Sequence, residues 1–273
     1  MITWSNPKNI FMKKTLQIAN VVALVITIVV HYLSNTGVFA GNTMKTISDN
    51  YHNYFTPAGY AFSIWGLIYI GLLAFVIYTG GGLFKKATDE WPIVEIGWWF
   101  VISCVANSLW VVAWLYDYIG LSVVLMIVLL FSLIKIILKT RMELDDLPLE
   151  KIAFVWWPFS LYSGWITVAL IADVAAYLTK IKWNGFGISE IAWTIVMMII
   201  AGIINLIITW KRNMREFALV GAWALVAIAV SNWNVEKSIA YSAIIIAVIL
   251  FISSSIHAYR NRANNPWKKF LPG

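Results

Sequence analysis

Charged residues are scarce in this chain of 273 residues, since only 12% are Asp, Glu, Lys or Arg. Soluble domains carry about 25%. With 61% hydrophobic residues and a mean hydropathy of +0.78, the chain lacks the polar surface that a soluble fold requires. Cys104 is the only cysteine, which excludes an intrachain disulfide framework and a cysteine zinc cluster. The composition therefore predicts an integral membrane protein without a metal site.

Groups for acid–base and nucleophilic chemistry are also few. No Gly-rich phosphate loop, His-Glu-x-x-His motif or credible Ser/His/Asp set occurs. His31 and His257 end apolar runs that finish on opposite sides of a membrane, so the two cannot share one haem iron. The last two apolar runs hold no lysine for a retinal Schiff base. We predict no catalytic residues and do not expect an enzyme, with Asp173 the main candidate for a general base.

Long apolar runs dominate what is present. A bilayer core of about 30 Å is crossed by about 20 helical residues at 1.5 Å each. These runs are apolar throughout, whereas the strands of a membrane barrel alternate polar and apolar residues. The sequence predicts an all-α polytopic membrane helical bundle with eight spans: Leu16–Leu33, Tyr60–Tyr78, Ile93–Leu115, Ile119–Ile137, Phe154–Leu178, Ile188–Trp210, Phe217–Val230 and Ile239–Ile256.

The distribution of basic residues orients these spans. Lys and Arg accumulate on the cytoplasmic side of a membrane protein. Eight spans put 16 of the 20 Lys and Arg on the side of both termini, and four on the other side: Lys45, Lys180, Lys182 and Lys237. We therefore predict a multi-pass protein with both termini in the cytoplasm. The alternative for the first span is a signal peptide cleaved after Val38-Phe39-Ala40, which would leave seven spans.

Three of the predicted spans carry large side chains at helical spacing, which places them on one face of each helix. The stripes are Phe62, Trp65 and Tyr69 in the second span, Ser103, Asn107, Trp110 and Trp114 in the third, and Pro158, Tyr162, Trp165, Ala169 and Asp173 in the fifth. Most of these residues lie in the half of the membrane next to the long external connection Ser34–Gly59. They predict an aromatic cavity beneath that connection, and the alternative is plain packing and interfacial anchoring.

These residues resemble motifs of the translocator protein or tryptophan-rich sensory protein family (TspO/MBR). The segment from Pro57 to Tyr69 is similar to the start of that family's second helix, and Asn107-Ser108-Leu109-Trp110 to its third. Trp156 to Trp165, followed by Ala169, resembles its fifth helix. Tyr60 stands where the family often has Trp, and Asp173 stands where Asn is usual. The resemblance covers about residues 16–180 and leaves the last three spans outside it.

The resemblance implies a five-helix TspO-like transmembrane domain at residues 1–187. Residues 188–273 would then be a three-helix transmembrane extension with a basic cytoplasmic tail. It also implies binding of a rigid apolar ligand, a porphyrin or other tetrapyrrole or a sterol-like molecule, with a transport, sensing or receptor role. No cofactor is required, and a porphyrin or haem is the expected kind of ligand. The implied ligand-binding residues are Tyr60, Phe62, Trp65, Tyr69, Asn107, Trp110, Tyr162, Trp165, Ala169 and Asp173.

Other readings stay open. One is a secondary transporter that uses all eight helices, with Asp173 as the coupling site. Another is a membrane enzyme acting on a tetrapyrrole or isoprenoid-like substrate.

If ionised, Asp173 would repel porphyrin propionates, so Asp173→Asn is expected to strengthen porphyrin binding. Val174–Lys180 follows a weak sterol-contact pattern. The expected partners are membrane lipid and the small apolar ligand, without nucleic acid, and a homodimer stays open.

Overall fold

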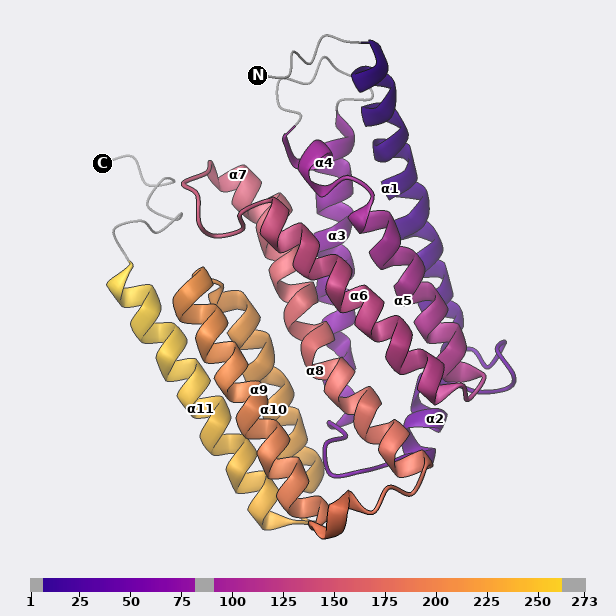
Figure 1. Ribbon diagram of the computed structural model, residues 1–273, viewed down its shortest axis with the longest axis vertical. Coiled ribbons are helices and arrows are strands. Elements are labelled where there is room, and N and C mark those ends of the chain that lie inside the picture. Colours follow the sequence, from indigo (N-terminus) through magenta and orange to yellow (C-terminus); the bar gives the residue numbers. More distant parts are fainter. Residues whose placement is uncertain (1–6, 82–90, 262–273) are drawn as a thin grey trace.

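The computed structural model describes residues 7–81 and 91–261, and these residues form helices and no strand (Figure 1). The first group of helices is α1 (Pro7–Leu33), α2 (Met44–Asn50), η1 (Gly59–Ser63), α3 (Ile64–Gly80), α4 (Trp91–Ile96), α5 (Trp99–Leu115) and α6 (Ile119–Lys139). The second group is α7 (Leu149–Lys151), η3 (Ile152–Trp156), α8 (Trp157–Lys180), η4 (Gly185–Gly187), α9 (Glu190–Arg212), α10 (Arg215–Asn232) and α11 (Lys237–Arg260).

Seven helical segments of the described residues are long and apolar enough to cross a membrane, which confirms the polytopic helical bundle. The predicted span Ile93–Leu115 is wrong as one continuous helix, because the chain breaks between α4 and α5. Gly97 has a φ of +56° there, a left-handed conformation that glycine adopts readily because it has no Cβ. The 17 residues of α5 alone give about 25 Å of helix, which is shorter than a typical bilayer core.

The predicted fifth span begins with an irregular turn. Residues Ile152–Trp156 form a π-helical segment, η3, directly before α8. Pro158 follows in the first turn of α8 and has no backbone N–H to bond the carbonyl four residues earlier. A local widening of the helix accommodates such a missing bond. Pro158 also lies close to α3, since a Cβ placed on Gly71 of α3 would be 3.3 Å from the Pro158 Cβ.

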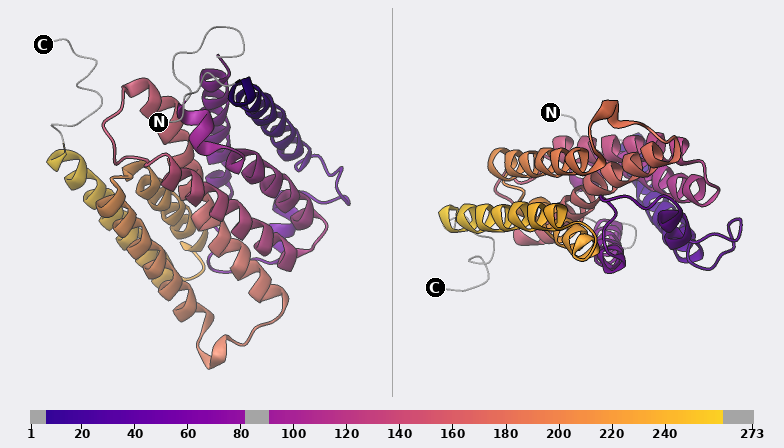
Figure 2. Two further views of the ribbon diagram at one scale, coloured as in Figure 1. Left: turned by 45° about the horizontal axis from the view of Figure 1, so that its top comes forward. Right: turned by 90° about the horizontal axis from the view of Figure 1, so that it is seen from below.

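The helices form one bundle in which α1 and α11 lie at opposite edges and α8 runs between them (Figure 2). The start of α1 and the end of α11 are at one end of the bundle, here called the terminal end, and α2 is at the other, the loop end (Figure 1). Of the basic residues that orient the spans, Lys85, Lys86, Arg262, Lys268 and Lys269 lie outside the described residues, as does the side chain of Lys8.

The three C-terminal helices join the first five through α10. This helix packs against α8, and its backbone and side chains bond the segment that leads into α3. Ala58 N donates to the Ala227 carbonyl at 3.0 Å, and Trp223 Nε1 donates to the Ala61 carbonyl at 3.3 Å. The buried core runs continuously through both groups of helices. The boundary at residue 187 falls in the α8–α9 connection, and the division into two domains stays a prediction.

At the terminal end, the connection between α6 and α7 docks on the corner between α9 and α10. Arg212 donates to the carbonyls of Ile137 and Met142 at 3.2 and 3.3 Å, and Asn213 Nδ2 donates to the Glu143 carbonyl at 3.0 Å. The Glu143 side chain turns inward, and its Oε1 is buried without a hydrogen-bond partner. Burial raises the pKa of Glu143 to about 8, with the charge of Glu216 adding to the rise and that of Arg215 opposing it.

We expect the stability of the fold to depend on pH through Glu143. The folded state holds the Glu143 proton more tightly than the unfolded chain, where the pKa is near its ordinary value of 4.5. The resulting stabilisation is complete below pH 4.5 and is lost as the pH rises to 8. We expect the unfolding temperature in detergent to fall between pH 5 and pH 8, and Glu143→Gln to reduce that fall. The exposed Glu150→Gln is the control, and an equal effect of both variants would contradict the prediction.

Candidate functional site

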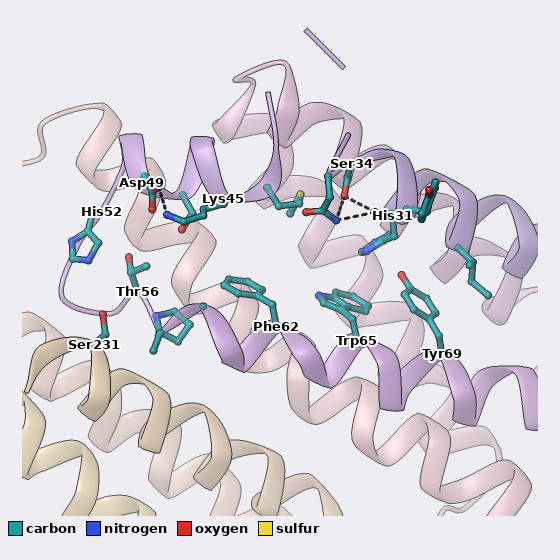
Figure 3. Close-up of a pocket in the computed structure, with 18 residues that line it drawn as sticks. His31, Ser34, Lys45, Asp49, His52, Thr56, Phe62, Trp65, Tyr69 and Ser231 are labelled. Carbon is teal, nitrogen blue, oxygen red and sulfur yellow. Dashed lines mark hydrogen bonds and ion pairs between the residues drawn. The ribbon is translucent and has the colours of Figure 1, made fainter. Parts of the chain in front are cut away.

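Three aromatic side chains project from one face of η1 and α3 toward α1 and α2, as the helical spacing predicts (Figure 3). They are Phe62, Trp65 and Tyr69. The rings of Trp65 and Tyr69 stack, with centroids 5.5 Å apart and planes 22° apart. Trp65 also stacks with Trp110 of α5, at 6.3 Å and 27°. Trp65 therefore stacks with both Tyr69 and Trp110, and these three rings are here called the aromatic wall.

The large cavity at the loop end lies between α1, α2 and α3 and has a volume of about 610 Å³. Its aromatic lining is His31 and Tyr32 from α1, Phe62 from η1, and Trp65 and Tyr69 from α3. Its rim is polar and includes Lys45, Ser48, Asp49 and His52. Lys45 and Asp49 form an exposed ion pair within α2 (Figure 3). We call this space the loop cavity. It combines an apolar interior with a charged entrance.

A second cavity lies between α3, α5 and α8, where the sequence predicts the ligand pocket. Its volume is only about 60 Å³. Side chains of the predicted site line it: Phe62, Trp65, Trp110, Trp165, Ala169 and Asp173. Pockets for drug-sized ligands usually measure about 300–1,000 Å³, so this space is too small for a porphyrin or a sterol, whereas the loop cavity has the required size. The indoles converge as predicted, but they fill most of the space between their helices.

Beneath the aromatic wall, a chain of hydrogen bonds joins α1, α5 and α8. Asn107 donates from Nδ2 to the Tyr162 hydroxyl at 2.8 Å, and its Oδ1 lies 3.0 Å from His31 Nε2. Asn107 and Tyr162 are fully buried and line neither cavity. His31 also packs on the aromatic wall, with its ring centroid 4.6 Å from that of Trp65. The predicted amide bonds His31, and the predicted phenol packs against Trp65 with ring centroids 5.9 Å apart.

His31 is absent from the residues that the sequence predicts for the site. From the sequence, this histidine is considered only as a haem ligand together with His257, because a single residue near the end of a span carries little information. A signal was nevertheless present along the first span. Polar residues recur there at spacings of three, four or seven, and all are buried or half-buried: Gln17, Asn20, Thr27, His31 and Ser34. A polar stripe on a membrane helix marks the face that packs inside the protein.

Asp173 connects three helices. Its Oδ2 accepts from Trp110 Nε1 of α5 at 3.1 Å, and its Oδ1 accepts from Ser122 Oγ of α6 at 2.8 Å. The side chain is 3% exposed. Both carboxyl oxygens therefore have partners, and in the described part of the chain Asp173 forms no ion pair. It lines the small cavity and lies outside the lining of the loop cavity.

Tyr60 is the one predicted site residue that the structure places away from the others. Its ring packs edge-on against Trp223 of α10, with centroids 5.2 Å apart, and it lines neither of the two cavities described above. Residues Gly59–Ser63 form the 3-10 turn η1, which precedes the regular turns of α3 and changes the direction of Tyr60 relative to Phe62. Tyr60 instead contributes to the junction between α3 and α10.

Three polar side chains connect the end of α2 to the rest of the bundle. The Tyr51 hydroxyl donates to Asp117 Oδ1 at 2.8 Å, and Lys180 Nζ lies 2.8 Å from Asp117 Oδ2. Burial alone would raise the pKa of Asp117, but hydrogen bonds from Lys180 and Tyr51 and the Lys180 charge bring it below its ordinary value. Lys180, the last residue of the sterol-contact pattern, is thus engaged in holding the end of α8 to the α5–α6 turn.

A family model described as TSPO-like protein matches residues 17–256. The chain belongs to the TSPO-like protein family. No curated protein and no solved structure matches it.

The TSPO-like match reaches beyond the segment that the motifs cover. It continues to residue 256 and so includes α9, α10 and most of α11, which the motifs alone leave outside the resemblance. The contacts of α10 agree with this extent, because α10 supports both the backbone before α3 and the face of α8. The eight apolar segments of this TSPO-like chain therefore belong to one family match.

Proposed function

We propose that this TSPO-like membrane protein binds a flat, rigid apolar ligand in the loop cavity. Ligands of the porphyrin class fit the observations best, and sterol-like molecules are the second class. The observation that carries the proposal is the aromatic wall beside a space of about 610 Å³. Aromatic rings prefer offset stacking on another flat ring system, and such contacts add about 0.5–1.5 kcal/mol to the burial of apolar area.

The rim of the loop cavity suits the acidic edge of a porphyrin. Lys45 is 79% exposed at its side chain, and its ion pair with Asp49 is exposed as well. Exposed pairs are worth only about 0–1 kcal/mol, so Lys45 can exchange Asp49 for a ligand carboxylate at little cost. No cofactor enters this proposal, and a porphyrin or haem would be the ligand itself.

We further propose that the loop end faces away from the cytoplasm. Lys45, Lys180, Lys182 and Lys237 lie at that end, and the other basic residues that the structure describes are more numerous and lie toward the terminal end, which suits a cytoplasmic location. The ligand would then enter from the extracytoplasmic side or from the adjacent leaflet. A transport or sensing role is part of this proposal.

The test is a titration of the purified protein in detergent with protoporphyrin, read by tryptophan fluorescence and by porphyrin absorbance together. We expect saturable binding that Trp65→Ala weakens at least about tenfold, since buried tryptophans are frequent hot spots of binding. Trp98→Ala is the control, because Trp98 is half-exposed and lines neither cavity. Equal affinities of the two variants would contradict a site at Trp65.

The variant Asp173→Asn distinguishes porphyrin binding in the loop cavity from porphyrin binding in the small cavity. The sequence-based expectation of stronger porphyrin binding depends on a ligand in contact with Asp173. Asp173 does not line the loop cavity, so a ligand there would not contact it, and we now expect unchanged affinity. An Asn side chain can still accept from Trp110 and can donate to Ser122, whose hydroxyl also bonds the Ile119 carbonyl. A marked gain in affinity would place the porphyrin in the small cavity.

Secondary transport is a second candidate, favoured by Asp173 itself. A carboxyl group buried in a membrane span is costly and often marks a coupling site. This function predicts pH-dependent uptake of porphyrin into proteoliposomes that Asp173→Asn abolishes. Binding without flux would favour a sensor, and a spectrally new product during the titration would favour an enzyme.

A further inference from the structure

A groove at the loop end separates α8 from α9. Helix α10 packs against both of them, but the α8–α9 connection, residues 181–189, holds their ends apart. The space between them has a volume of about 410 Å³. Because both helices are membrane spans, this groove opens at the level of one leaflet. His52, Asn53 and Phe55 of the connection after α2 also line it, and His52 lines the loop cavity as well, but none of the aromatic wall residues lines the groove.

The lining of the groove changes from apolar to polar along the helices. Ile171, Val174 and Leu178 of α8 and Met197 of α9 supply apolar side chains. Closer to the α8–α9 connection the lining becomes polar and aromatic. This order matches a lipid molecule, whose acyl chains lie deeper in the bilayer than its headgroup.

Two opposite charges lie at the polar end of the groove without pairing. Lys182 and Glu190 both line it and are exposed, and among the described residues neither forms an ion pair. A ligand that carries one negative and one positive group would meet both charges. An anionic lipid would meet Lys182 but also the like charge of Glu190, and a sterol would offer a charge to neither.

Two tryptophans complete the polar end. Trp183 and Trp193 lie with ring centroids 5.3 Å apart, and both line the groove. Trp193 Nε1 donates to the Gly185 carbonyl at 2.8 Å, which fixes this ring against the connection. Tryptophan is enriched at the level of lipid headgroups, and its face attracts ammonium groups. The position and chemistry of these rings agree with a bound headgroup.

We propose that the α8–α9 groove is a binding site for one phospholipid with a zwitterionic headgroup. The lipid phosphate lies at Lys182, and its ammonium group lies at Glu190 beside Trp183 and Trp193. One acyl chain follows Leu178 and Val174 along α8. The site depends on α9 and is independent of the porphyrin proposal.

The test compares lipids retained by the purified full-length protein in native mass spectrometry. The probes are phosphatidylethanolamine, phosphatidylglycerol and cholesterol, added one at a time to delipidated protein. We expect one phosphatidylethanolamine to be retained at least about fivefold better than either other lipid, and Lys182→Glu to remove that preference. Lys237→Glu is the matched control, since this lysine is at the same end of the bundle and outside the groove.

A second pair of variants tests the acyl-chain part of the groove. Val174→Trp fills the space between α8 and α9, whereas Val124→Trp places the same ring on the exposed face of α6. We expect only Val174→Trp to lower retention of phosphatidylethanolamine, by about fivefold or more, with porphyrin affinity unchanged in both. Equal retention by the two variants, or better retention of phosphatidylglycerol or cholesterol by the wild-type protein, would overturn the proposal.

Discussion

Replacing Asn107 with Leu is expected to destabilise the protein by about 2–6 kcal/mol. The substitution leaves His31 and Tyr162 without the amide that bonds both of them, and each buried polar group without a partner costs about 1–3 kcal/mol. Leucine is apolar and not much larger than asparagine, so the loss reports on hydrogen bonds more than on packing. The measurement is the unfolding temperature in detergent. The control is Asn50→Leu, since Asn50 is exposed at the end of α2.

A second substitution isolates the bond to Tyr162. In the wild-type background, Tyr162→Phe leaves Asn107 Nδ2 without an acceptor. In the Asn107→Leu background the amide is already absent, so Tyr162→Phe leaves no donor without a partner. The cost of Tyr162→Phe should therefore be smaller in the Asn107→Leu background. Additive costs, or an Asn107→Leu protein as stable as Asn50→Leu, would show that this chain of hydrogen bonds does not support the site.

Gly164→Leu is expected to separate α8 from α10. A Cβ on Gly164 would lie 3.0 Å from the Phe217 carbonyl oxygen and 3.2 Å from the Phe217 Cα. These are backbone atoms of α10 and move only if the whole helix moves. Small residues at such crossings let membrane helices pack closely. Overpacking costs about 1–3 kcal/mol where side chains can adjust, so we expect at least the upper value here.

The same change should weaken porphyrin binding, because α10 supports the chain around Ala58 and Ala61, where the loop cavity meets α3. The unfolding temperature and the porphyrin affinity are measured on the same preparation. Gly66→Leu is the control, since a Cβ on Gly66 has no neighbour within 4 Å. Comparable losses in both variants would mean that leucine in a membrane helix, and not the α8–α10 contact, is responsible.

The helices and the aromatic stripe were accessible from the sequence for a local reason. Hydropathy sums over about 20 neighbouring residues, and the face of a helix follows from its period of 3.6 residues. Phe62, Trp65 and Tyr69 therefore share a face in the structure, as the spacing predicts. The break at Gly97 was missed because a hydropathy window does not register a single residue with positive φ.

Residues of the site that depend on neighbours far apart in the chain were harder to predict. Tyr60 continues the same sequence motif as Phe62, yet it contacts Trp223, which is 163 positions later in the chain. His31 joins Asn107 and Trp65 through contacts across three helices. Neither set of contacts can be predicted from local composition. Only the polar stripe of the first span indicated that His31 faces the inside of the protein.

By itself, the sequence determined that this protein is a helical membrane bundle of the TSPO-like family, and it predicted that indoles and an acid meet near the long connection. Only the tertiary structure decided which space beside Trp65 is large enough for a ligand. A cavity is the space left after side chains from distant segments have packed. Four tryptophans close the gap between α3, α5 and α8 to about 60 Å³, while a space of about 610 Å³ remains between α1, α2 and α3.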